Sequence, residues 1–401
     1  MDEKTLNSFK LAGLRAGQIT QAAAQDSTLV RAAMKLNLWR KDTKIKTKRF
    51  FKRLRTPKPV ASARLRVLVH IRGGIGDVVM TRVFIKKLRE ILPQALIYFA
   101  YDYKAAVDMV FTDGLINDFH SNKYLPKEFD LIISGCHLLM YDFINRPRIE
   151  KLAPHLLPII EKGLAVQACF KPFATYTPHL DGQLASITMA HGGGRVTNLG
   201  WFSGLEIDQN DEAPLTLDPQ KTAQVLARHG LTNLQYITIH DGINTHTDTS
   251  KGHPTRCWPQ THWEEFARLF KKNFPHIKLV QLGGEKSHIF DFVDISLVGK
   301  TPLKELPYIL GNARLHVDGE SGMVHIAHLT STNSVVLFGP TPVAYFGYAR
   351  NTNIQAPVCG GCMNICKHWM TQCLLGYPPE KQCMASITPR TVFEAVQKRL
   401  T

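Results

Sequence analysis

Long apolar runs are missing from this sequence of 401 residues. No run approaches the roughly 18 apolar residues that a membrane-spanning helix needs, and the N-terminus lacks the apolar core of a secretory signal. We therefore expect a cytoplasmic protein. Hydrophobic residues make up 44% of the chain, which excludes a largely disordered protein. A chain of this length is too long for one compact hydrophobic core, so we expect two domains with an appendage.

Cysteine is scarce except near the C-terminus. Five of the eight cysteines crowd one segment with the spacing C-x2-C-x3-C-x6-C-x9-C: Cys359, Cys362, Cys366, Cys373 and Cys383. In a chain without a secretion signal, such a cluster indicates metal binding more than disulfides. The spacing is not that of a zinc ribbon with two CxxC pairs. The alternative is a small subdomain packed around reduced thiols.

Acidic residues are rare in the first 66 residues. This segment holds 17 of the 49 Lys and Arg but only 4 of the 33 Asp and Glu, a balance of +13 that leaves +3 for the rest of the chain. Residues 1–60 show no strand pattern, and their cations are mixed with Trp39, Phe50 and Phe51. We predict a basic amphipathic arm that suits an anionic membrane surface. Nonspecific nucleic-acid binding and a solvated tail are the alternatives.

After the arm, strand and helix patterns alternate. A buried strand (Arg66–Ile71) leads into a Gly-rich loop (Gly73–Asp77) and an amphipathic helix (Val78–Leu92), and ALIYFAY and DLIISG follow as strands. Between Pro154 and Leu205 the pattern is weaker, and we assign no structure there.

A second alternating series begins near Tyr236. Its strands are YITIHDG, KLVQLGG, ARLHVDG and SVVLFGP, and its helices are expected from about Thr261, Leu303 and Gly322. Such alternation predicts an α/β protein with two doubly wound, parallel-sheet, Rossmann-like lobes. We place them at residues 61–212 and 213–401, after the arm at 1–60.

The loop Gly73–Asp77 is the first candidate site. Its glycines Gly73, Gly74 and Gly76 let the backbone approach a ligand closely. Asp77 lies at the carboxyl end of a parallel strand, where open α/β sheets bind ligands. Asp77 is therefore a candidate catalytic group, and the alternative is a simple helix cap.

Three further loops follow strands of the second series. Residues 318–325 open a helix whose free amides would bind an anion, and Ser321 and His325 share a helix face. This arrangement suits a diphosphate, although His325 packed against the sheet is an equal alternative. Arg256 can hold a phosphate through two hydrogen bonds or is a solvated loop arginine. The last loop, Gly339–Pro342, lines the same cleft or is only a turn.

Together these elements resemble glycosyltransferase family 9, the ADP-heptose:lipopolysaccharide heptosyltransferases and their relatives. The resemblance runs from about Arg64 to the C-terminus, with order and spacing preserved. Arg256 replaces the family's Lys, and Glu320 replaces its Asp. The family's GIGD, K-x-W-P, Gly-Gly-x-x-Glu-like, D-S-G-x-x-H and G-P-T elements correspond to Gly73–Asp77, Arg256–Pro259, Gly283-Gly284-Glu285, Glu320-Ser321-Gly322-Met323-Val324-His325 and Gly339-Pro340-Thr341.

The resemblance implies a two-lobed GT-B fold and inverting transfer of a sugar from a nucleotide donor such as ADP-heptose. No catalytic metal is expected. Asp77 would be the general base on the acceptor hydroxyl. Arg256 and the Ser321–Met323 amides would stabilise the leaving diphosphate, and His325 would orient its phosphates.

The family resemblance extends to the cysteines. Cys383–Pro389 matches a C-M-x-x-I-T/S-P signature, and some relatives that modify autotransporter proteins bind iron here and form rings. The resemblance therefore implies a structural Zn or Fe site and a homo-oligomer. The expected ligands are Cys359, Cys362, Cys373 and Cys383, with Cys366 spare.

The leading hypothesis is a heptosyltransferase at the inner face of the membrane that acts on a lipopolysaccharide core precursor. The alternatives are a protein O-heptosyltransferase that modifies an autotransporter, and a non-catalytic scaffold that binds nucleotides or nucleic acid. Nucleic acid is not the expected partner, because the intact Asp77 argues for an enzyme and an enzyme supplies an acceptor at the membrane.

Deleting residues 1–60 should leave a folded protein that binds anionic vesicles at least about tenfold more weakly, because each cation near such a surface contributes about 1 kcal/mol. Co-sedimentation with phosphatidylglycerol vesicles measures this, with neutral phosphatidylcholine vesicles as the control. Unchanged binding after the deletion would show that the arm is not the membrane contact.

Overall fold

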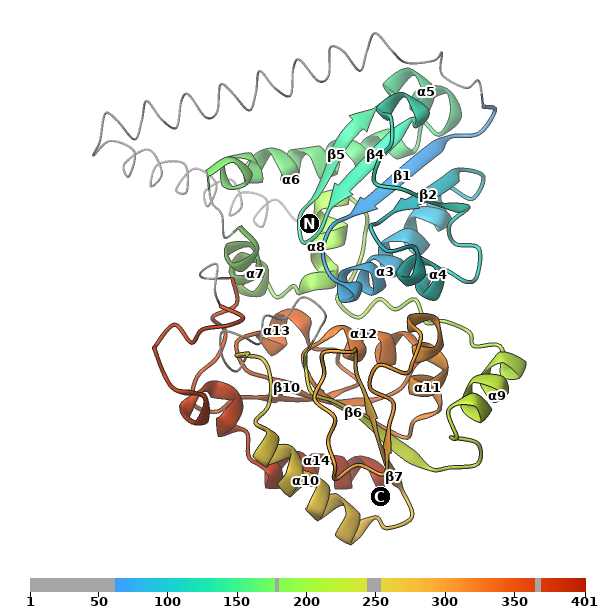
Figure 1. Ribbon diagram of the computed structural model, residues 1–401. Helices are drawn as coiled ribbons and strands as arrows, with labels where there is room; N and C mark the ends of the chain where they lie inside the picture. Colours follow the sequence, from blue (N-terminus) through green and yellow to red (C-terminus); the bar gives the residue numbers. More distant parts are fainter. Residues whose placement is uncertain (1–61, 177–179, 244–253, 365–368) are drawn as a thin grey trace.

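The computed structural model describes residues 62–176, 180–243, 254–364 and 369–401. The predicted arm at 1–60 and Cys366 lie outside the described residues. Two α/β lobes lie one above the other in Figure 1, with the N-terminal lobe in blue to green and the C-terminal lobe in yellow to red. The described part of the chain contains no helix that is long and apolar enough to cross a bilayer.

The N-terminal lobe is built on a five-stranded sheet of order β3-β2-β1-β4-β5. The central strand β1 pairs in parallel with β2 and β4, whereas the edge strand β5 runs antiparallel to β4. The strands are β1 (Arg66–Ile71), β2 (Leu96–Ala100), β3 (Asp118–His120), β4 (Leu131–Gly135) and β5 (Leu139–Ile144). The three strands expected from apolar runs are present. The short β3 and the half-exposed β5 lack such runs and were not expected.

Among the described residues, six helices accompany this sheet. They are α3 (Ile75–Ile91), α4 (Lys104–Val110), α5 (Arg146–Leu152), α6 (Leu156–Tyr176), α7 (Leu180–Ala190) and α8 (Arg195–Ser203). The stretch without an assignment, Pro154 to Leu205, is thus mainly helical. Its helix α6 is apolar on several faces and contacts other helices as well as β5, so its sequence gives little amphipathic period.

The C-terminal lobe has a six-stranded sheet of order β11-β10-β9-β6-β7-β8, with every pair parallel. Its strands are β6 (Tyr236–His240), β7 (Lys278–Leu282), β8 (Ile295–Ser296), β9 (His316–Gly319), β10 (Ser334–Phe338) and β11 (Thr352–Gln355). Its helices are α9 (Pro219–Arg228), α10 (Gln260–Asn273), α11 (Leu306–Asn312), α12 (Gly322–Leu329), α13 (Val343–Phe346) and α14 (Pro389–Leu400). The expected strands and helices are confirmed to within a few residues.

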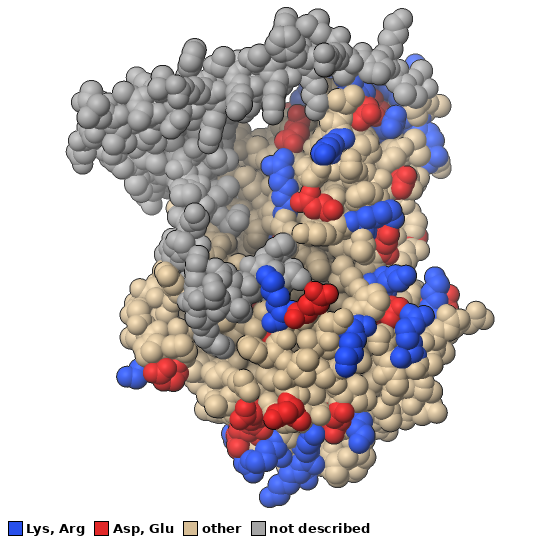
Figure 2. All heavy atoms as spheres, viewed as in Figure 1, with Lys and Arg blue, Asp and Glu red and all other residues tan. Residues whose placement is uncertain are grey.

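The two faces of the second sheet are covered by different helices. Buried aromatic residues of α10, among them Trp263 and Phe266, pack with α14 against one face. Helices α11 and α12 cover the other face and turn toward the N-terminal lobe (Figure 1). On the molecular face that Figure 2 shows, Lys and Arg of the described residues are interspersed with Asp and Glu rather than gathered in one patch.

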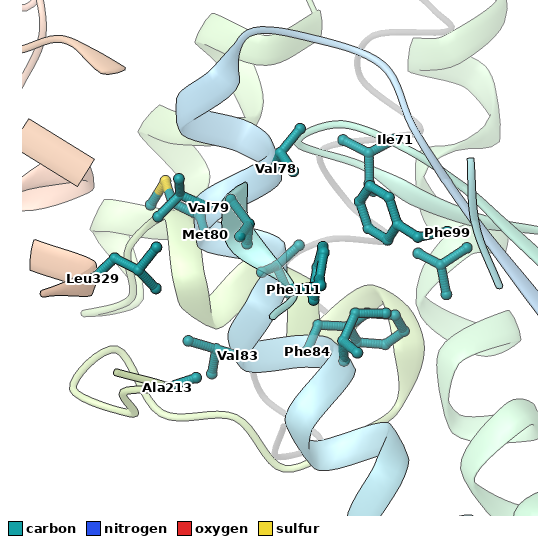
Figure 3. Packing of buried hydrophobic residues seen from close by; sticks show 14 of the residues in the cluster. Ile71, Val78, Val79, Met80, Val83, Phe84, Phe99, Phe111, Ala213 and Leu329 are labelled. Atoms are coloured by element: carbon teal, nitrogen blue, oxygen red, sulfur yellow. The ribbon is translucent and has the colours of Figure 1, made fainter. Parts of the chain in front are cut away.

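Helix α3 joins the lobes. Phe84 and Phe99 pack together on the side of α3 that faces the first sheet, while Leu329 of α12 reaches toward Val79 and Val83 on its other side (Figure 3). One cluster of buried apolar residues therefore runs from the N-terminal sheet through α3 into the C-terminal lobe. This packing holds the strand ends of the two sheets face to face.

Candidate active site

The N-termini of α3 and α12 meet between the lobes. A Cβ placed on Gly76 would lie 2.5 Å from the Cδ2 of His325, closer than real side chains approach one another. Only glycine therefore fits at this position without a shift of the His325 ring. The contact brings the loop Gly73–Asp77 and the segment Ser321–His325 together, as the sequence predicted.

Asp77 is the third residue of α3, which begins at Ile75 rather than at the expected Val78. Its Oδ2 accepts a hydrogen bond of 2.9 Å from the N–H of Gly74, so the carboxylate does cap the helix. Its Oδ1 accepts a second hydrogen bond, of 3.0 Å, from Nη2 of Arg195. The side chain is 18% exposed, so a ligand can still reach it.

Arg195 is a functional residue that the sequence reasoning missed. It opens α8, is fully buried, and also donates from Nη2 to the carbonyl of Cys136 at 3.0 Å. Its Nε and Nη1 have no hydrogen-bond partner among the described residues. The available signal was one cation after the glycines of HGGGRVTNLGW, in the stretch without an assignment.

The electrostatics keep Asp77 ionised. Burial raises its pKa, but Arg195 and then His137 lower it by more, with hydrogen bonds from Cys136 and Arg195 adding to the effect. The pKa of Asp77 therefore lies below its ordinary value, and the group is a carboxylate at neutral pH. This arrangement buries an arginine, and the carboxylate of Asp77 offsets its positive charge.

This carboxylate and two neighbouring side chains are potential metal ligands. Within the described ranges, Asp77, Cys136 and His137 form the one group whose ligand atoms all lie within 4.8 Å of one another. Nη2 of Arg195 is already 3.0 Å from Oδ1 of Asp77, and its positive charge disfavours a cation there. We therefore interpret the group as a proton-handling site rather than a metal centre.

Across the cleft, Ser321 caps α12. Its Oγ accepts from the N–H of Met323 at 3.1 Å and donates to Oδ2 of Asp318. That same Oδ2 lies 3.0 Å from Nδ1 of His240 at the end of β6. Burial lowers the pKa of His240, but Asp318 raises it by more, to about 9. A buried ion pair that sequence reasoning missed therefore supports the Ser321 cap.

Arg256, Glu320 and His325 come together as predicted. Nη1 of Arg256 is 3.3 Å from Oε2 of Glu320, and Nε2 of His325 is 3.4 Å from Oε1 of the same carboxylate. Nδ1 of His325 is held by the hydroxyl of Tyr348 at 2.7 Å. The carboxylate of Glu320 thus contacts both side chains.

The other predicted donor residues lie at the same edge of the second sheet. Gly283, Gly284 and Glu285 follow β7, where the N–H of Ser287 donates to the carbonyl of Gly284 at 3.0 Å. The Oγ of Ser287 donates to Asp241, one residue beyond His240, at 3.0 Å.

The loop Gly339-Pro340-Thr341 rests on the Cys-rich segment. The N–H of Gly361 donates to the carbonyl of Gly339 at 3.3 Å, and the N–H of Met363 donates to that of Pro340 at 3.0 Å. The thiols behind this loop are near neighbours. Burial raises the pKa of Cys383 to about 11, and the thiolate charges of the other expected ligands add to the shift: Cys362, Cys359 and Cys373.

The gathered thiols do not form a closed site. Among the described residues, no three of the four expected ligands have sulfur atoms within 4.8 Å of one another. Four thiols are a donor set that Zn or Fe accepts, but here their sulfur atoms are not gathered at one point. The metal site therefore stays a prediction.

The sequence and the fold are similar to those of known proteins. Residues 218–364 match the family described as "Glycosyltransferase family 9 (heptosyltransferase)". This part of the chain is thus similar to that family. Lipopolysaccharide heptosyltransferase 1 of Escherichia coli (strain K12) is 25% identical over 139 residues, which are 33% of this chain and 43% of that protein. The chain thus spans less than half the length of the curated relatives that it matches.

Solved structures extend the likeness beyond residues 218–364. The ADP-heptose heptosyltransferase II of E. coli superposes with a TM-score of 0.53 at 14% identity, over 84% of this chain and 98% of that one. The iron-containing dodecameric glycosyltransferase TibC of enterotoxigenic E. coli gives 0.55 at 14% identity, over 85% and 83%. The predicted two-lobed GT-B fold is confirmed.

The His240–Asp318 pair predicts a pH-dependent stability. Because the folded state raises the pKa of His240 from 6.5 to about 9, the stabilisation is complete below about pH 6.5 and is lost as the pH rises through 9. Between pH 6.5 and 10 the wild-type free energy of unfolding should fall by at least about 1 kcal/mol more than that of His240→Gln. Urea titrations at each pH measure this. The exposed His276→Gln is the control, and parallel curves for wild type and His240→Gln would contradict the pairing.

Proposed function

We propose that this protein is an inverting glycosyltransferase that moves a heptose from an ADP-heptose-like donor to an acceptor hydroxyl. The observation that carries the proposal is the opposition of an ionised carboxylate, Asp77, to the N-terminus of α12 across the Gly76 contact. A general base in one lobe and an anion site in the other are the two parts that such a transfer needs.

The donor diphosphate would bind at the N-terminus of α12. Helix N-termini attract anions through their free N–H groups and the helix dipole. Arg256 would exchange its contact with Glu320 for the phosphates, and His325 would orient them. The remaining proposed donor residues are Gly283, Gly284, Glu285, Glu320, Ser321, Gly322, Met323, Gly339, Pro340 and Thr341.

The reaction is a single displacement. The acceptor hydroxyl gives its proton to Asp77 while its oxygen forms a bond to the anomeric carbon of the sugar. The bond from that carbon to the diphosphate breaks, and the electron pair leaves with the phosphate oxygen, where Arg256 and the α12 amides stabilise the new negative charge. Every step uses groups of this chain and needs no metal.

Similar proteins support ADP-heptose as the donor and are consistent with two classes of acceptor. Heptosyltransferase II and TibC carry ADP-heptose in their descriptions, and TibC is described in complex with ADP-D-beta-D-heptose. Relatives named for lipopolysaccharide favour a lipopolysaccharide core precursor as acceptor. The gathered thiols favour the alternative of a protein acceptor, because the structural neighbour TibC is iron-containing.

The location and assembly follow from the same proposal. The arm at residues 1–60 would hold the enzyme at the inner face of the membrane, close to a lipid-linked acceptor. A homo-oligomer is proposed by likeness to the dodecameric TibC. The scaffold that binds nucleic acid is not favoured, because charges of both signs are mixed on the visible face (Figure 2).

Asp77→Asn should lower transfer from ADP-heptose by about 10²–10⁴-fold, the usual contribution of a placed base. The donor affinity of Asp77→Asn, measured by calorimetry, should stay within about twofold of wild type, because Asp77 faces the acceptor. Arg256→Ala should bind ADP at least about tenfold more weakly than wild type, because it loses a charged hydrogen bond. The Asp77→Asn substitution leaves the Arg195 charge unpaired, so both assays are run at a temperature where circular dichroism shows the variant folded.

The matched control is Asp108→Asn, an exposed acid on α4 that pairs with Lys104. It should transfer normally. Near-normal transfer by Asp77→Asn would remove this carboxylate from the base role. Unchanged ADP affinity in Arg256→Ala would move the diphosphate site elsewhere.

The purified protein should carry about one Zn or Fe per chain, held by four thiolates as in closed structural sites. The ligand variant Cys362→Ser should lose the metal and melt at a lower temperature, whereas Cys366→Ser should keep both properties. Elemental analysis of protein prepared without nickel resin measures the content. Cys169→Ala, which alters a thiol within α6, is the control. A content near zero with titratable thiols would leave the cluster as plain packing.

A further inference from the structure

Tyr345 of the C-terminal lobe is buried among residues of the N-terminal lobe. It lies on the short helix α13, directly after the loop Gly339–Thr341, and is fully buried. Its ring stacks on His137 with centroids 5.9 Å apart and planes inclined by 7°. Its hydroxyl accepts from Nδ2 of Asn198 at 2.7 Å and lies 3.1 Å from Nδ1 of His137.

The amide of Asn198 orients this hydroxyl. In the structure Oδ1 of Asn198 faces Oγ1 of Thr188 at 2.8 Å, and that Oγ1 also lies 2.7 Å from the carbonyl of Leu184, while the NH₂ group of Asn198 faces Tyr345. Because Asn198 donates to the phenol oxygen, the phenol proton is available to Nδ1 of His137. His137 then carries its own proton on Nε2, which lies 3.9 Å from Oδ1 of Asp77. The proton-bearing edge of the imidazole thus faces the carboxylate.

We propose that Tyr345 is a positioning residue through which the donor-side loop sets the general base. By fixing the orientation and tautomer of His137, Tyr345 directs an N–H dipole at Oδ1 of Asp77, the oxygen that also accepts from Arg195. The proposal rests on the proposed role of Asp77 as base. Under this proposal, Asp77 has all of its neighbours in place only when α13 packs against the N-terminal lobe. The loop at the donor site is thereby linked to the acceptor side.

The groups that face Asp77 come from four parts of the fold. They are Arg195 of α8, His137 and Cys136 after β4, Tyr101 after β2, and Glu320 after β9. Substitution of Tyr345 leaves all of them in the chain and alters only the direction in which His137 presents its proton. His137 contributes to holding the pKa of Asp77 below its ordinary value, so a ring that no longer faces the carboxylate in this orientation should raise that pKa.

Tyr345→Phe keeps the ring and removes the hydroxyl. With ADP-heptose as donor and a lipopolysaccharide core precursor as acceptor, kcat should fall about fivefold to tenfold, as for one ordinary hydrogen bond. The KM for the donor should stay within about twofold, because the phosphate contacts are intact. The acid limb of the kcat profile should move to higher pH, a change that a purely structural role would not cause.

The matched control is Tyr236→Phe, which removes another buried hydroxyl of the same lobe, bonded to the carbonyl of Ile309 at 2.7 Å. It should match Tyr345→Phe in thermal stability but leave kcat and the pH profile unchanged. An unshifted acid limb with wild-type kcat in Tyr345→Phe would overturn the proposal.

A second measurement needs no substrate. In protein labelled with ¹⁵N-histidine, the ring nitrogens of His137, assigned with His137→Gln, should report an Nε2–H tautomer that Tyr345→Phe converts to a mixture. An unchanged tautomer would overturn the positioning role. If Asp77→Asn kept its activity while the tautomer changed as expected, the proposed base would fail and the contact between Tyr345 and His137 would stand.

Discussion

The close approach of two helix N-termini governs the rest of this structure. Helices α3 and α12 begin after central strands of different sheets, and a hydrogen atom at Gly76 is all that the ring of His325 leaves room for. Two positive helix ends therefore share one narrow space. Carboxylates from both sides, Asp77 and Glu320, offset that charge, and the same field is available to an incoming diphosphate.

Each buried carboxylate in this space has a cationic partner. Asp77 pairs with Arg195, Glu320 with Arg256, and Asp318 with His240. A lone charge in such surroundings would cost several kcal/mol. The pairs differ in exposure: Arg195 is fully buried, whereas the side chain of Arg256 is 21% exposed. The exposed cation can change partners when an anion arrives, and the buried one can only hold the carboxylate that it already has.

The sequence predicts those parts of the fold and the site that depend on patterns of neighbouring residues. Apolar runs identify β1 and β6, and glycines followed by an acid identify the loop at Asp77. Contacts between distant residues leave no such pattern. Arg195 and Asp77 are 118 positions apart, and Asn198 and Tyr345 are 147 apart. The antiparallel edge strand β5 escapes prediction for a related reason, because its side chains alternate only weakly between buried and half-exposed positions.

The apolar cluster that passes through α3 also determines how the two lobes can move. Pulling them apart would expose Leu329 together with Val79 and Met80 to water, at about 25 cal/mol for every Å² uncovered. The two lobes are therefore packed together along this seam in the structure. Any opening that separates them there must offset that cost.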